Sequence, residues 1–449
     1  MPAEPPTIAA IATAPGRGAV GIVRLSGPAS SHIAVQLAGS LPPPRLAALR
    51  ALRAPSGPLI DQGLCLFFPA PASYTGEDMV ELQAHGGPAV LRELLNACCA
   101  AGARQARPGE FTERAFLNGK LDLLQAEAVA SLIESSSAQA ARAAARACAG
   151  DFSQAVAGIA QQLIALRVRL EAEIDFADDT PELSADADTA KRFASLRRDL
   201  QNLLAQAFAG ARLAEGVEVA ILGLPNTGKS TLLNRLCGED RAIVTPLAGT
   251  TRDVLSVDVD VDGVMFRLAD TAGLRDTDDL IEQEGVRRAR ARALNADLII
   301  HVISAEALQA PDPPEILAAL ARGQSVLRVI NKIDLVDASA PTSAAVAGAE
   351  VWISALLGQG IPLLRAALLA AAGLADIGEV PFTARARHVR ALEKTAQAIA
   401  EAETQFSAAA IELACEHLRL AHALLEELTG VYTTEDLLGA IFATFCIGK

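Results

Sequence analysis

A phosphate-binding pattern stands near the middle of the chain. Residues 223–230 read Gly-Leu-Pro-Asn-Thr-Gly-Lys-Ser; they follow the apolar run Val219–Leu222 and precede the helix-like segment Thr231–Leu236. Glycines in such a loop let backbone N–H groups turn toward phosphates, while the lysine supplies positive charge and the serine hydroxyl is placed to bind Mg²⁺. The loop therefore predicts a nucleotide site with Ser230 as a Mg²⁺ ligand. The residues expected at the phosphates are Asn226, Thr227, Gly228, Lys229, Ser230 and Thr231.

Two later segments indicate which base is bound. Asn331-Lys-Ile-Asp334 follows the apolar run Val326–Ile330, and Ser354-Ala355 follows another short apolar run. The Asp334 carboxylate can accept hydrogen bonds from both N1–H and N2–H of guanine, and adenine lacks this pair of donors. A backbone N–H after Ser354 can reach guanine O6. The residues expected at the base are Asn331, Lys332, Asp334, Ser354, Ala355 and Leu356.

Two loops are expected to meet the magnesium ion and the γ-phosphate. Asp270-Thr-Ala-Gly273 ends the apolar run Met265–Leu268, so its carboxylate can hold Mg²⁺ through water and its glycine N–H can sense the γ-phosphate. Residues 245–253 form the candidate first switch, with Thr251 as the second protein ligand of Mg²⁺. The phosphate loop and the segments at 270–273, 331–334 and 354–355 each fall at the C-terminal edge of a predicted strand, where open α/β sheets bind ligands, which argues against unrelated turns. The positions expected at the nucleotide are Thr245, Pro246, Leu247, Ala248, Gly249, Thr250, Thr251, Asp270, Thr271, Ala272 and Gly273.

The residue that orients the attacking water is not the usual one. Ras-type GTPases place glutamine directly after the Asp-x-x-Gly motif, but Leu274 stands here and can neither donate nor accept a hydrogen bond. We hypothesise that Glu282 acts through a bridging water as general base or orienter; the alternative is a solvated charge at a helix start. Asn226 offers an amide oxygen that, with carbonyls of residues 245–250, can hold a monovalent cation; the alternative is a capping role in the phosphate loop.

The elements that must position these residues change character along the chain. Residues 1–119 mix short β-like runs with proline and glycine, and residues 120–215 are rich in Ala, Leu, Gln and Glu at helical spacing. Residues 216–372 alternate strands and helices, and residues 373–449 return to helical texture. We predict a multidomain fold of α/β and all-α parts, in which a helical domain carries an inserted Ras-like P-loop GTPase domain. Strands are expected at residues 21–25, 63–68, 79–82, 219–222, 265–268, 298–303 and 326–330.

Charge and cysteine content limit the class of protein. The net charge of −14 disfavours a protein whose main task is to grip nucleic acid, so such contact must be local or made by a partner. Residues 385–390 hold a local basic patch that can touch nucleic-acid phosphate or form a solvated helix face. Seven cysteines without paired metal-ligand spacing fit free thiols in a reducing compartment. With neither a signal-peptide pattern nor a long apolar run, we expect a cytoplasmic protein with no membrane contact.

Several motifs together resemble one family. The motifs are Pro225–Ser230, Ala248–Asp253, Thr75–Asp78, His85–Gly87, Arg107–Asn118 and the C-terminal Phe445–Lys449. With them the chain resembles the MnmE/TrmE family of tRNA-modifying GTPases from about residue 7 to residue 449. The N-terminal and C-terminal motifs are the specific ones, because other GTPases share only the middle.

The resemblance implies a GTP hydrolase that works on tRNA with a partner. It implies an N-terminal domain that binds 5-formyltetrahydrofolate or a related tetrahydrofolate and forms a homodimer. A heterocomplex with the flavoprotein MnmG/GidA, which would hold much of the tRNA, would install an aminomethyl or carboxymethylaminomethyl group on carbon 5 of the wobble uridine. The resemblance also implies K⁺ as the monovalent cation and gives Glu282 the catalytic position. The implied K⁺ ligands are Asn226, Thr245, Leu247 and Thr250.

The resemblance further implies folate contacts at Arg24, Glu81, Lys120 and Lys449. A carboxylate such as Glu81 suits the paired N–H donors of a pterin, and cations suit the glutamyl tail. Without the resemblance each is an ordinary surface charge. Cys446 is a candidate catalytic thiol whose thiolate would need a positive charge such as Lys449 nearby; the alternative is a small buried hydrophobe.

Two rival functions share many of these motifs. One is a GTPase switch in ribosome assembly, similar to the Era/Der group, and the other is a folate-dependent one-carbon enzyme with a regulatory G domain. The long N-terminal α/β region, the acidic balance and the Cys-Ile-Gly-Lys end disfavour the ribosome role. The one-carbon enzyme differs from a tRNA-modifying GTPase only in which half of the chain carries the chemistry.

Overall fold

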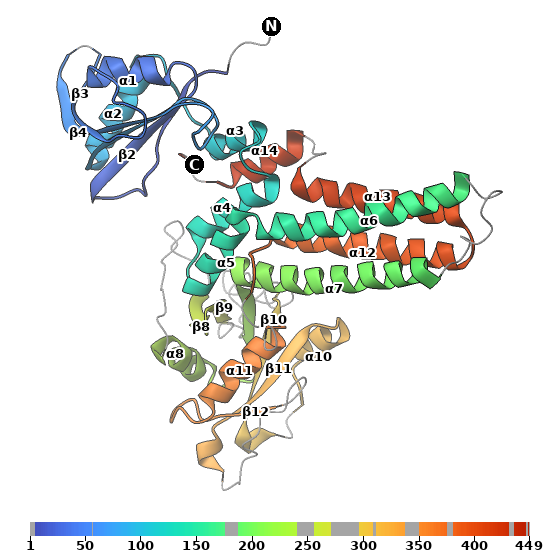
Figure 1. Ribbon diagram of the computed structural model, residues 1–449. Helices are drawn as coiled ribbons and strands as arrows, with labels where there is room; N and C mark the ends of the chain where they lie inside the picture. The colour runs from blue at the N-terminus through green and yellow to red at the C-terminus, as the bar shows by residue number, and fades with distance from the viewer. Residues whose placement is uncertain are drawn as a thin grey trace, which may run out of the picture. The chain divides into compact units, whose positions relative to one another are not determined.

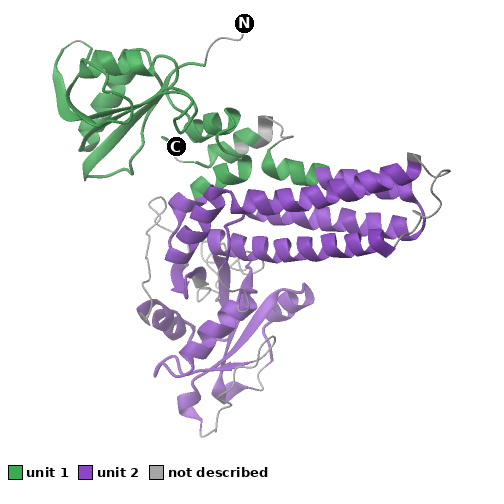
Figure 2. Ribbon diagram, viewed as in Figure 1, with its two compact units in different colours: residues 1–130, 423–449 green, residues 131–422 purple. Residues whose placement is uncertain are grey.

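The chain divides into two compact units. The computed structural model describes residues 5–55, 57–175, 187–239, 256–270, 296–308, 311–336, 350–374, 380–430, 435–445 and 448. One unit comprises residues 1–130 with 423–449, and the other residues 131–422 (Figure 2). The expected combination of α/β and all-α parts is confirmed. Among the described residues, no helix combines the length and apolar character that a membrane span requires.

The first unit contains a sheet of six strands backed by two helices (Figure 1). These elements are β1 (Ile8–Ile11), β2 (Gly18–Ser26), β3 (Ala48–Arg53), β4 (Leu59–Phe68), β5 (Met79–Gly86) and β6 (Arg104–Gln105), with α1 (Ser30–Ala38) and α2 (Pro88–Ala100). The strand order is β3-β4-β5-β2-β1-β6, and the predicted strands are confirmed within β2, β4 and β5. Val80 and Leu82 of β5 share a buried core with Leu94 of α2, because alternate residues of a strand face the same side.

The two ends of the sequence meet in the first unit. Its remaining helices are α3 (Glu110–Leu117), the start of α4 (Leu123–Glu134), the end of α13 (Ile411–Thr429) and α14 (Glu435–Ala443). Leu123 of α4 packs in one apolar cluster with Phe442 and Phe445. A Cβ on Gly448, whose φ is +98°, would lie 2.1 Å from the carbonyl oxygen of Ile11, so only glycine fits against this strand end.

The second unit begins with long helices. They are α5 (Ala138–Ala149), α6 (Asp151–Asp175), α7 (Ala187–Glu215) and α12 (Ala386–Ser407), together with most of α13. The predicted helical stripe is confirmed on α6, where Leu163, Leu166 and Leu170 are buried. Phe152 at the start of α6 stacks on Phe382 with ring centroids 4.4 Å apart.

A second six-stranded sheet completes this unit. Its elements are β7 (Val217–Leu222), β8 (Ser256–Val261), β9 (Val264–Asp270), β10 (Leu298–Ser304), β11 (Ser325–Asn331) and β12 (Val351–Trp352), with α8 (Lys229–Glu239), α10 (Pro314–Ala321) and α11 (Ile361–Ala371). The order is β12-β11-β10-β7-β9-β8, and all neighbours are parallel except β8 and β9. The predicted strands are confirmed within β7, β9, β10 and β11.

Helices cover both faces of this sheet. Leu232 of α8 and Leu364 of α11 lie in the core on one face, and Ile316 of α10 lies in a separate cluster on the other. This doubly wound arrangement brings the carboxyl ends of β7, β9, β10 and β11 to one edge. Residues Ala209 and Leu213 of α7 belong to the same core as β7, so the helical segment is continuous with the sheet.

Candidate functional site

The phosphate loop has the backbone that its sequence requires. β7 is buried from Val219 to Leu222, and the chain turns at Gly223, where φ is +151°. A Cβ on Gly223 would lie 2.2 Å from the carbonyl oxygen of Val302, and one on Gly228 would lie 2.2 Å from Nδ2 of Asn331. Both glycines are therefore required by close approach as well as by conformation.

Lys229 is hydrogen-bonded within its own loop. Its Nζ donates to the carbonyl oxygens of Gly223 and Leu224, each at 2.9 Å, and the Thr227 hydroxyl donates to the Leu224 carbonyl at 3.0 Å. A phosphate would replace these carbonyls as a charge-assisted acceptor for the ammonium. Ser230 is exposed at the start of α8, so its hydroxyl is accessible to a cation.

Asn331 joins the phosphate loop to residues 354–357, which we call the base-reading loop. Its side chain is buried with 2% exposure; Nδ2 donates to the Thr227 carbonyl at 2.9 Å, and Oδ1 accepts from the Ala355 amide at 3.0 Å. Sequence reasoning gave Asn331 a contact with the nucleotide and missed this bridge. Because both bonds are buried, the amide fixes the spacing between two loops that flank the proposed nucleotide.

Asp334 and Ser354 form the next link. The Ser354 hydroxyl donates to Oδ1 of Asp334 at 2.5 Å and accepts from the Leu357 amide at 3.1 Å. Asp334 itself is exposed, within the short 3₁₀ turn η2 (Ile333–Leu335). Lys332, two residues before Asp334, has a left-handed backbone conformation with φ +67°. The structure thus brings together the predicted residues at 331–334 and 354–356.

Arg235 was not foreseen as part of this site. It lies on α8, where Nε donates to the Ala355 carbonyl at 2.9 Å and the guanidinium also donates to the Leu356 carbonyl. No local motif signals this contact, because it joins residues 120 positions apart.

Several predicted residues lie outside the described residues. These are Glu282 and Leu274, Cys446 and Lys449, the candidate first switch at residues 245–253, and Thr271, Ala272 and Gly273. For Asp270 the structure describes the backbone, which ends β9 and pairs with Ile221 of β7. Asp270 therefore stands at the same sheet edge as the phosphate loop.

Two of the predicted folate contacts lie side by side. Arg24 of β2 and Glu81 of β5 are cross-strand partners, and both Nε and a terminal nitrogen of Arg24 donate to Oε1 of Glu81, at 3.1 and 2.9 Å. The guanidinium lies 5.9 Å from the ring centroid of Tyr74 and 5.8 Å from that of Phe111. Lys120 instead donates to the Pro71 carbonyl at 3.1 Å, in the loop that carries Tyr74.

The motif at residues 107–118 has a structural role in this unit. Arg114 is buried and donates to both carboxylate oxygens of Glu77, at 3.1 and 3.0 Å, and to Glu110 at 3.1 Å. Burial alone would raise the pKa of Glu110, but hydrogen bonds from Arg104, the Arg107 amide and Arg114 outweigh it and lower the pKa to about 2. The charged motif therefore fixes α3 to the loop before β5.

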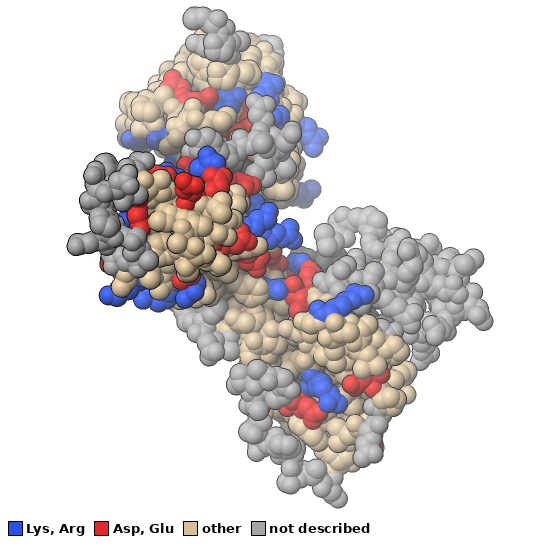
Figure 3. Space-filling view, turned by 90° about the vertical axis from the view of Figure 1, so that its right-hand side faces the viewer, with Lys and Arg blue, Asp and Glu red and all other residues tan. Residues whose placement is uncertain are grey.

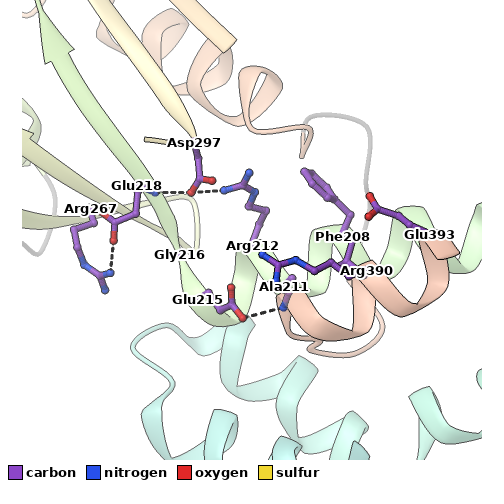
Figure 4. Close-up of a pocket in the computed structure, with 12 residues that line it drawn as sticks. Phe208, Ala211, Arg212, Glu215, Gly216, Glu218, Arg267, Asp297, Arg390 and Glu393 are labelled. Atoms are coloured by element: carbon purple, nitrogen blue, oxygen red, sulfur yellow. Dashed lines mark hydrogen bonds and ion pairs between the residues drawn. The ribbon is translucent and has the colours of Figure 1, made fainter. Parts of the chain in front are cut away.

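A pocket of about 460 Å³ lies at the other edge of the second sheet (Figure 4). Arg212 of α7 forms an ion pair with Asp297, whose Oδ2 also accepts from the Glu218 amide at 3.0 Å. Glu218 in turn pairs with Arg267 at 2.6 Å. Four acidic residues and three basic ones line it, so the pocket indicates a junction between α7 and the sheet and not a second anion site.

The predicted basic patch at residues 385–390 is only partly a surface feature. His388 is buried with 2% exposure, and its Nδ1 accepts a hydrogen bond from the Arg385 amide at 3.0 Å. Arg390 is exposed and lines the pocket at the junction. His388 thus caps the start of α12.

Comparison with known proteins identifies relatives along the whole chain. Residues 7–120 match the GTP-binding protein TrmE N-terminus, and residues 123–446 match the MnmE helical domain. The tRNA modification GTPase MnmE of Azoarcus sp. (strain BH72) is 49% identical, covering 100% of this chain and 99% of that protein. The protein of the same name from Ralstonia nicotianae is 47% identical, covering 98% of this chain and 96% of that protein.

A solved structure is similar over a shorter stretch. A single-substitution variant of Aquifex aeolicus Era bound to GDP·AlF4⁻ is 26% identical and covers 40% of this chain and 66% of that chain, with a TM-score of 0.27. The family assignment rests on the domain matches and the full-length relatives instead. The chain belongs to the MnmE family of tRNA modification GTPases.

Proposed function

We propose that this chain is a K⁺-dependent GTPase that, with a flavoprotein of the MnmG/GidA type, uses a tetrahydrofolate one-carbon unit to modify carbon 5 of the wobble uridine of certain tRNAs. The observation that carries the nucleotide part is the Asn331 bridge. It draws the phosphate loop and the base-reading loop to one sheet edge, where a triphosphate and guanine can be bound together.

Each residue at this edge has a distinct task. Lys229 exchanges its loop carbonyls for the β- and γ-phosphates, and Ser230 offers an exposed hydroxyl to Mg²⁺. Bound Mg²⁺ would neutralise charge that develops on the phosphates. Asp334 accepts the N1 and N2 hydrogens of guanine while Ser354 steadies one of its oxygens. The Ala355 amide already donates to Asn331, so an O6 contact through it would share that bond.

We assign GTP hydrolysis to Glu282 and to a bound cation. Glu282 orients or deprotonates the attacking water, since Leu274 offers no polar group. The proposed K⁺ ligands are Asn226, Thr245, Leu247 and Thr250; of these, Asn226 is exposed in the phosphate loop with φ +64°, which suits a side chain turned toward a ligand. The cation would stabilise negative charge between the β- and γ-phosphates.

The donor set of the first unit fits a pterin. Glu81 has 14% of its side chain exposed and Arg24 has 23%, so the pair is accessible from one side. Nearby Tyr74, which is half-buried, provides flat apolar surface above the fully buried Phe111, and the carboxylate and guanidinium provide an acceptor and donors. We assign folate binding to Arg24, Glu81, Lys120 and Lys449, with Cys446 as a candidate thiol in the same reaction.

The remaining parts of the proposal concern assembly. The sheet face opposite α1 and α2 exposes Leu49 at 66% and Leu64 at 37%, which are cross-strand partners, and this apolar face supports a homodimer. On the face drawn in Figure 3, basic and acidic residues are interspersed, which fits tRNA held largely by the partner. We assign residues 1–119 to folate binding, residues 120–215 and 373–449 to the helical domain, and residues 216–372 to the G domain, in a cytoplasmic protein.

Wobble nucleosides test the function directly. Cells lacking this gene should lose the carbon-5 modification by mass spectrometry, and the wild-type gene should restore it. Asp334→Asn should bind GTP weakly yet bind xanthosine triphosphate, because xanthine presents a hydrogen-bond acceptor where guanine presents a donor. Arg24→Ala should fail to restore the modification while it still hydrolyses GTP. Unchanged wobble nucleosides in the deleted strain would refute the proposal.

The cation requirement has its own assay. GTP hydrolysis should be fast in KCl and slow in NaCl, with nucleotide affinity nearly equal in the two salts. Glu282→Ala should lower kcat while KM stays near its wild-type value, which is the signature of a lost transition-state interaction. Equal turnover in both salts would remove K⁺ from the mechanism.

A further inference from the structure

Three consecutive peptide groups of the base-reading loop are fixed by different partners. The peptide between Ser354 and Ala355 is held at both ends, since its carbonyl accepts from the Gly358 amide at 2.8 Å and its N–H donates to Asn331. The peptide between Leu356 and Leu357 is also held at both ends, by Arg235 at the carbonyl and by the Ser354 hydroxyl at the N–H.

The peptide between these two is held at one end only. The carbonyl of Ala355 accepts from Nε of Arg235 at 2.9 Å. Among the described residues, none accepts a hydrogen bond from the Leu356 amide. A trans peptide is planar, with its C=O and N–H pointing in opposite directions. Arg235 therefore turns the Leu356 N–H away from α8.

We propose that Arg235 is a positioning residue for guanine recognition, which aims the Leu356 amide at O6 of the base. This inference rests on the proposed guanine site and names a residue that determines its specificity. Asp334 reads the N1 and N2 edge, and the Leu356 amide reads O6.

The position of Arg235 also links the base to the phosphates. α8 begins at Lys229, and the Leu232 amide donates to the Gly228 carbonyl at 2.9 Å, so the helix is continuous with the phosphate loop. Leu232 and Leu236 are buried in the core against the sheet, which fixes the rotation of α8 about its axis. Arg235 therefore lies at the edge of this core. Arg235 thus connects the helix that begins at the phosphate loop to the base-reading loop.

Two nucleotide analogues separate O6 from the N2 edge. 6-Thio-GTP replaces O6 with sulfur, a weaker acceptor, and keeps N1–H and the 2-amino group. ITP lacks the 2-amino group and keeps O6. Affinities of full-length protein for GTP, 6-thio-GTP and ITP are measured by competition against a fluorescent GDP. The variants are Arg235→Ala and, as a matched control on an exposed helix end of the same domain, Arg322→Ala.

Arg235→Ala should weaken GTP binding and reduce the preference for GTP over 6-thio-GTP, each by roughly three- to tenfold, as for one lost hydrogen bond. Its preference for GTP over ITP should stay at the wild-type value. Arg235→Lys should recover part of the lost preference, because an ammonium can still donate to one carbonyl. Arg322→Ala should match wild type throughout.

Three outcomes overturn the inference. It fails if Arg235→Ala keeps the wild-type preference over 6-thio-GTP, or loses both preferences equally, as a merely loosened domain would. If Arg235→Ala does not fold, Arg235→Lys decides, and a wild-type preference over 6-thio-GTP in that variant is the overturning result. A wild-type protein with no preference for guanine over adenine nucleotides would instead refute the proposed function itself.

Discussion

The two units each contain a buried polar centre, and the two centres differ in charge. In the nucleotide unit, the neutral amide of Asn331 bridges Thr227 and Ala355. In the N-terminal unit, the charged pair Arg114 and Glu110 joins α3 to Glu77, with Arg104 and the Arg107 amide completing the shell.

The difference matches what each region has to do. A neutral amide holds loops at modest cost and carries no net charge, so the charges at the proposed nucleotide site would come from Lys229 and Asp334. A buried ion pair is stable only while both charges keep their partners, because a buried charge left alone is strongly unfavourable. The first centre suits loops that exchange partners with a ligand, and the second suits a segment that must stay in place.

Removal of Arg114 should produce the largest effect. Arg114→Met keeps much of the volume but leaves Glu77 and Glu110 without their shared cation, so the N-terminal unit should lose about 3–5 kcal/mol of stability. Hydrogen exchange of the β5 and α3 amides measures the loss. Trp352, the single tryptophan, lies in the nucleotide unit, so its unfolding transition should not move.

A surface pair provides the control for this variant. Arg419 pairs with Glu416 on an exposed helix face, and Arg419→Met should leave hydrogen exchange in the N-terminal unit unchanged. If Arg114→Met also shows wild-type exchange in β5 and α3, the charged centre does not anchor this unit.

The second-largest effect is expected from low pH, which should destabilise the charged centre and not the neutral one. The pKa of Glu110 is about 2 in the folded protein against an ordinary value of 4.5, so its charged form is the one that folding favours. The stabilisation is complete above pH 4.5 and is lost as pH falls from 4.5 toward 2, by about 3 kcal/mol in all. The difference in stability between wild type and Glu110→Gln should shrink across this window when exchange of the N-terminal unit is compared at about pH 6 and about pH 3.

Asn331 has no titratable group, so the corresponding comparison gives a different result. The stability difference between wild type and Asn331→Ala should be the same at both of these pH values. A pH-dependent difference for Asn331→Ala would mean that the neutral centre is coupled to a carboxylate such as Asp334.

Loss of Asn331 should have an intermediate effect on stability and should also weaken nucleotide binding. Asn331→Ala leaves a buried carbonyl at Thr227 and a buried amide at Ala355 unsatisfied, which costs about 2–3 kcal/mol. Urea unfolding followed by Trp352 fluorescence measures the cost. GTP affinity should fall at least tenfold, because the two loops lose their fixed spacing; affinity equal to wild type would show that nucleotide contacts alone set it.

The fold could be predicted wherever strands are buried on both faces. β10 is buried along its whole length and reads as a continuous apolar run, whereas the edge strands β3 and β8 are interrupted by Arg at every third and Asp at every second residue, respectively. Such half-polar edges carry little sequence signal, and neither strand was predicted. The two-residue strand β12 was foreseen only as the run before Ser354.

The site could be predicted to the extent that its chemistry is local. The phosphate loop and the 331–334 segment each follow a strand, so their meeting at one edge follows from the parallel topology. The Asn331 bridge and the Arg235 contact span 104 and 120 positions along the chain. They depend on side-chain geometry between loops, which no residue pattern encodes.

The smallest effect is expected for Arg107, at the exposed edge of the charged centre. It tests whether a charge stabilises the centre without being buried. The Arg107 guanidinium pairs with Glu113 at 2.9 Å and with Glu110 at 3.6 Å, but its side chain is 64% exposed, and the hydrogen bond that Arg107 gives Glu110 at 2.8 Å comes from its backbone amide. Arg107→Ala should therefore cost only about 0.5 kcal/mol by hydrogen exchange, since water screens the lost ion pairs and the amide stays in place. A cost near that of Arg114→Met would mean that the Arg107 guanidinium, and not its amide, keeps Glu110 ionised, and that the centre extends to the surface.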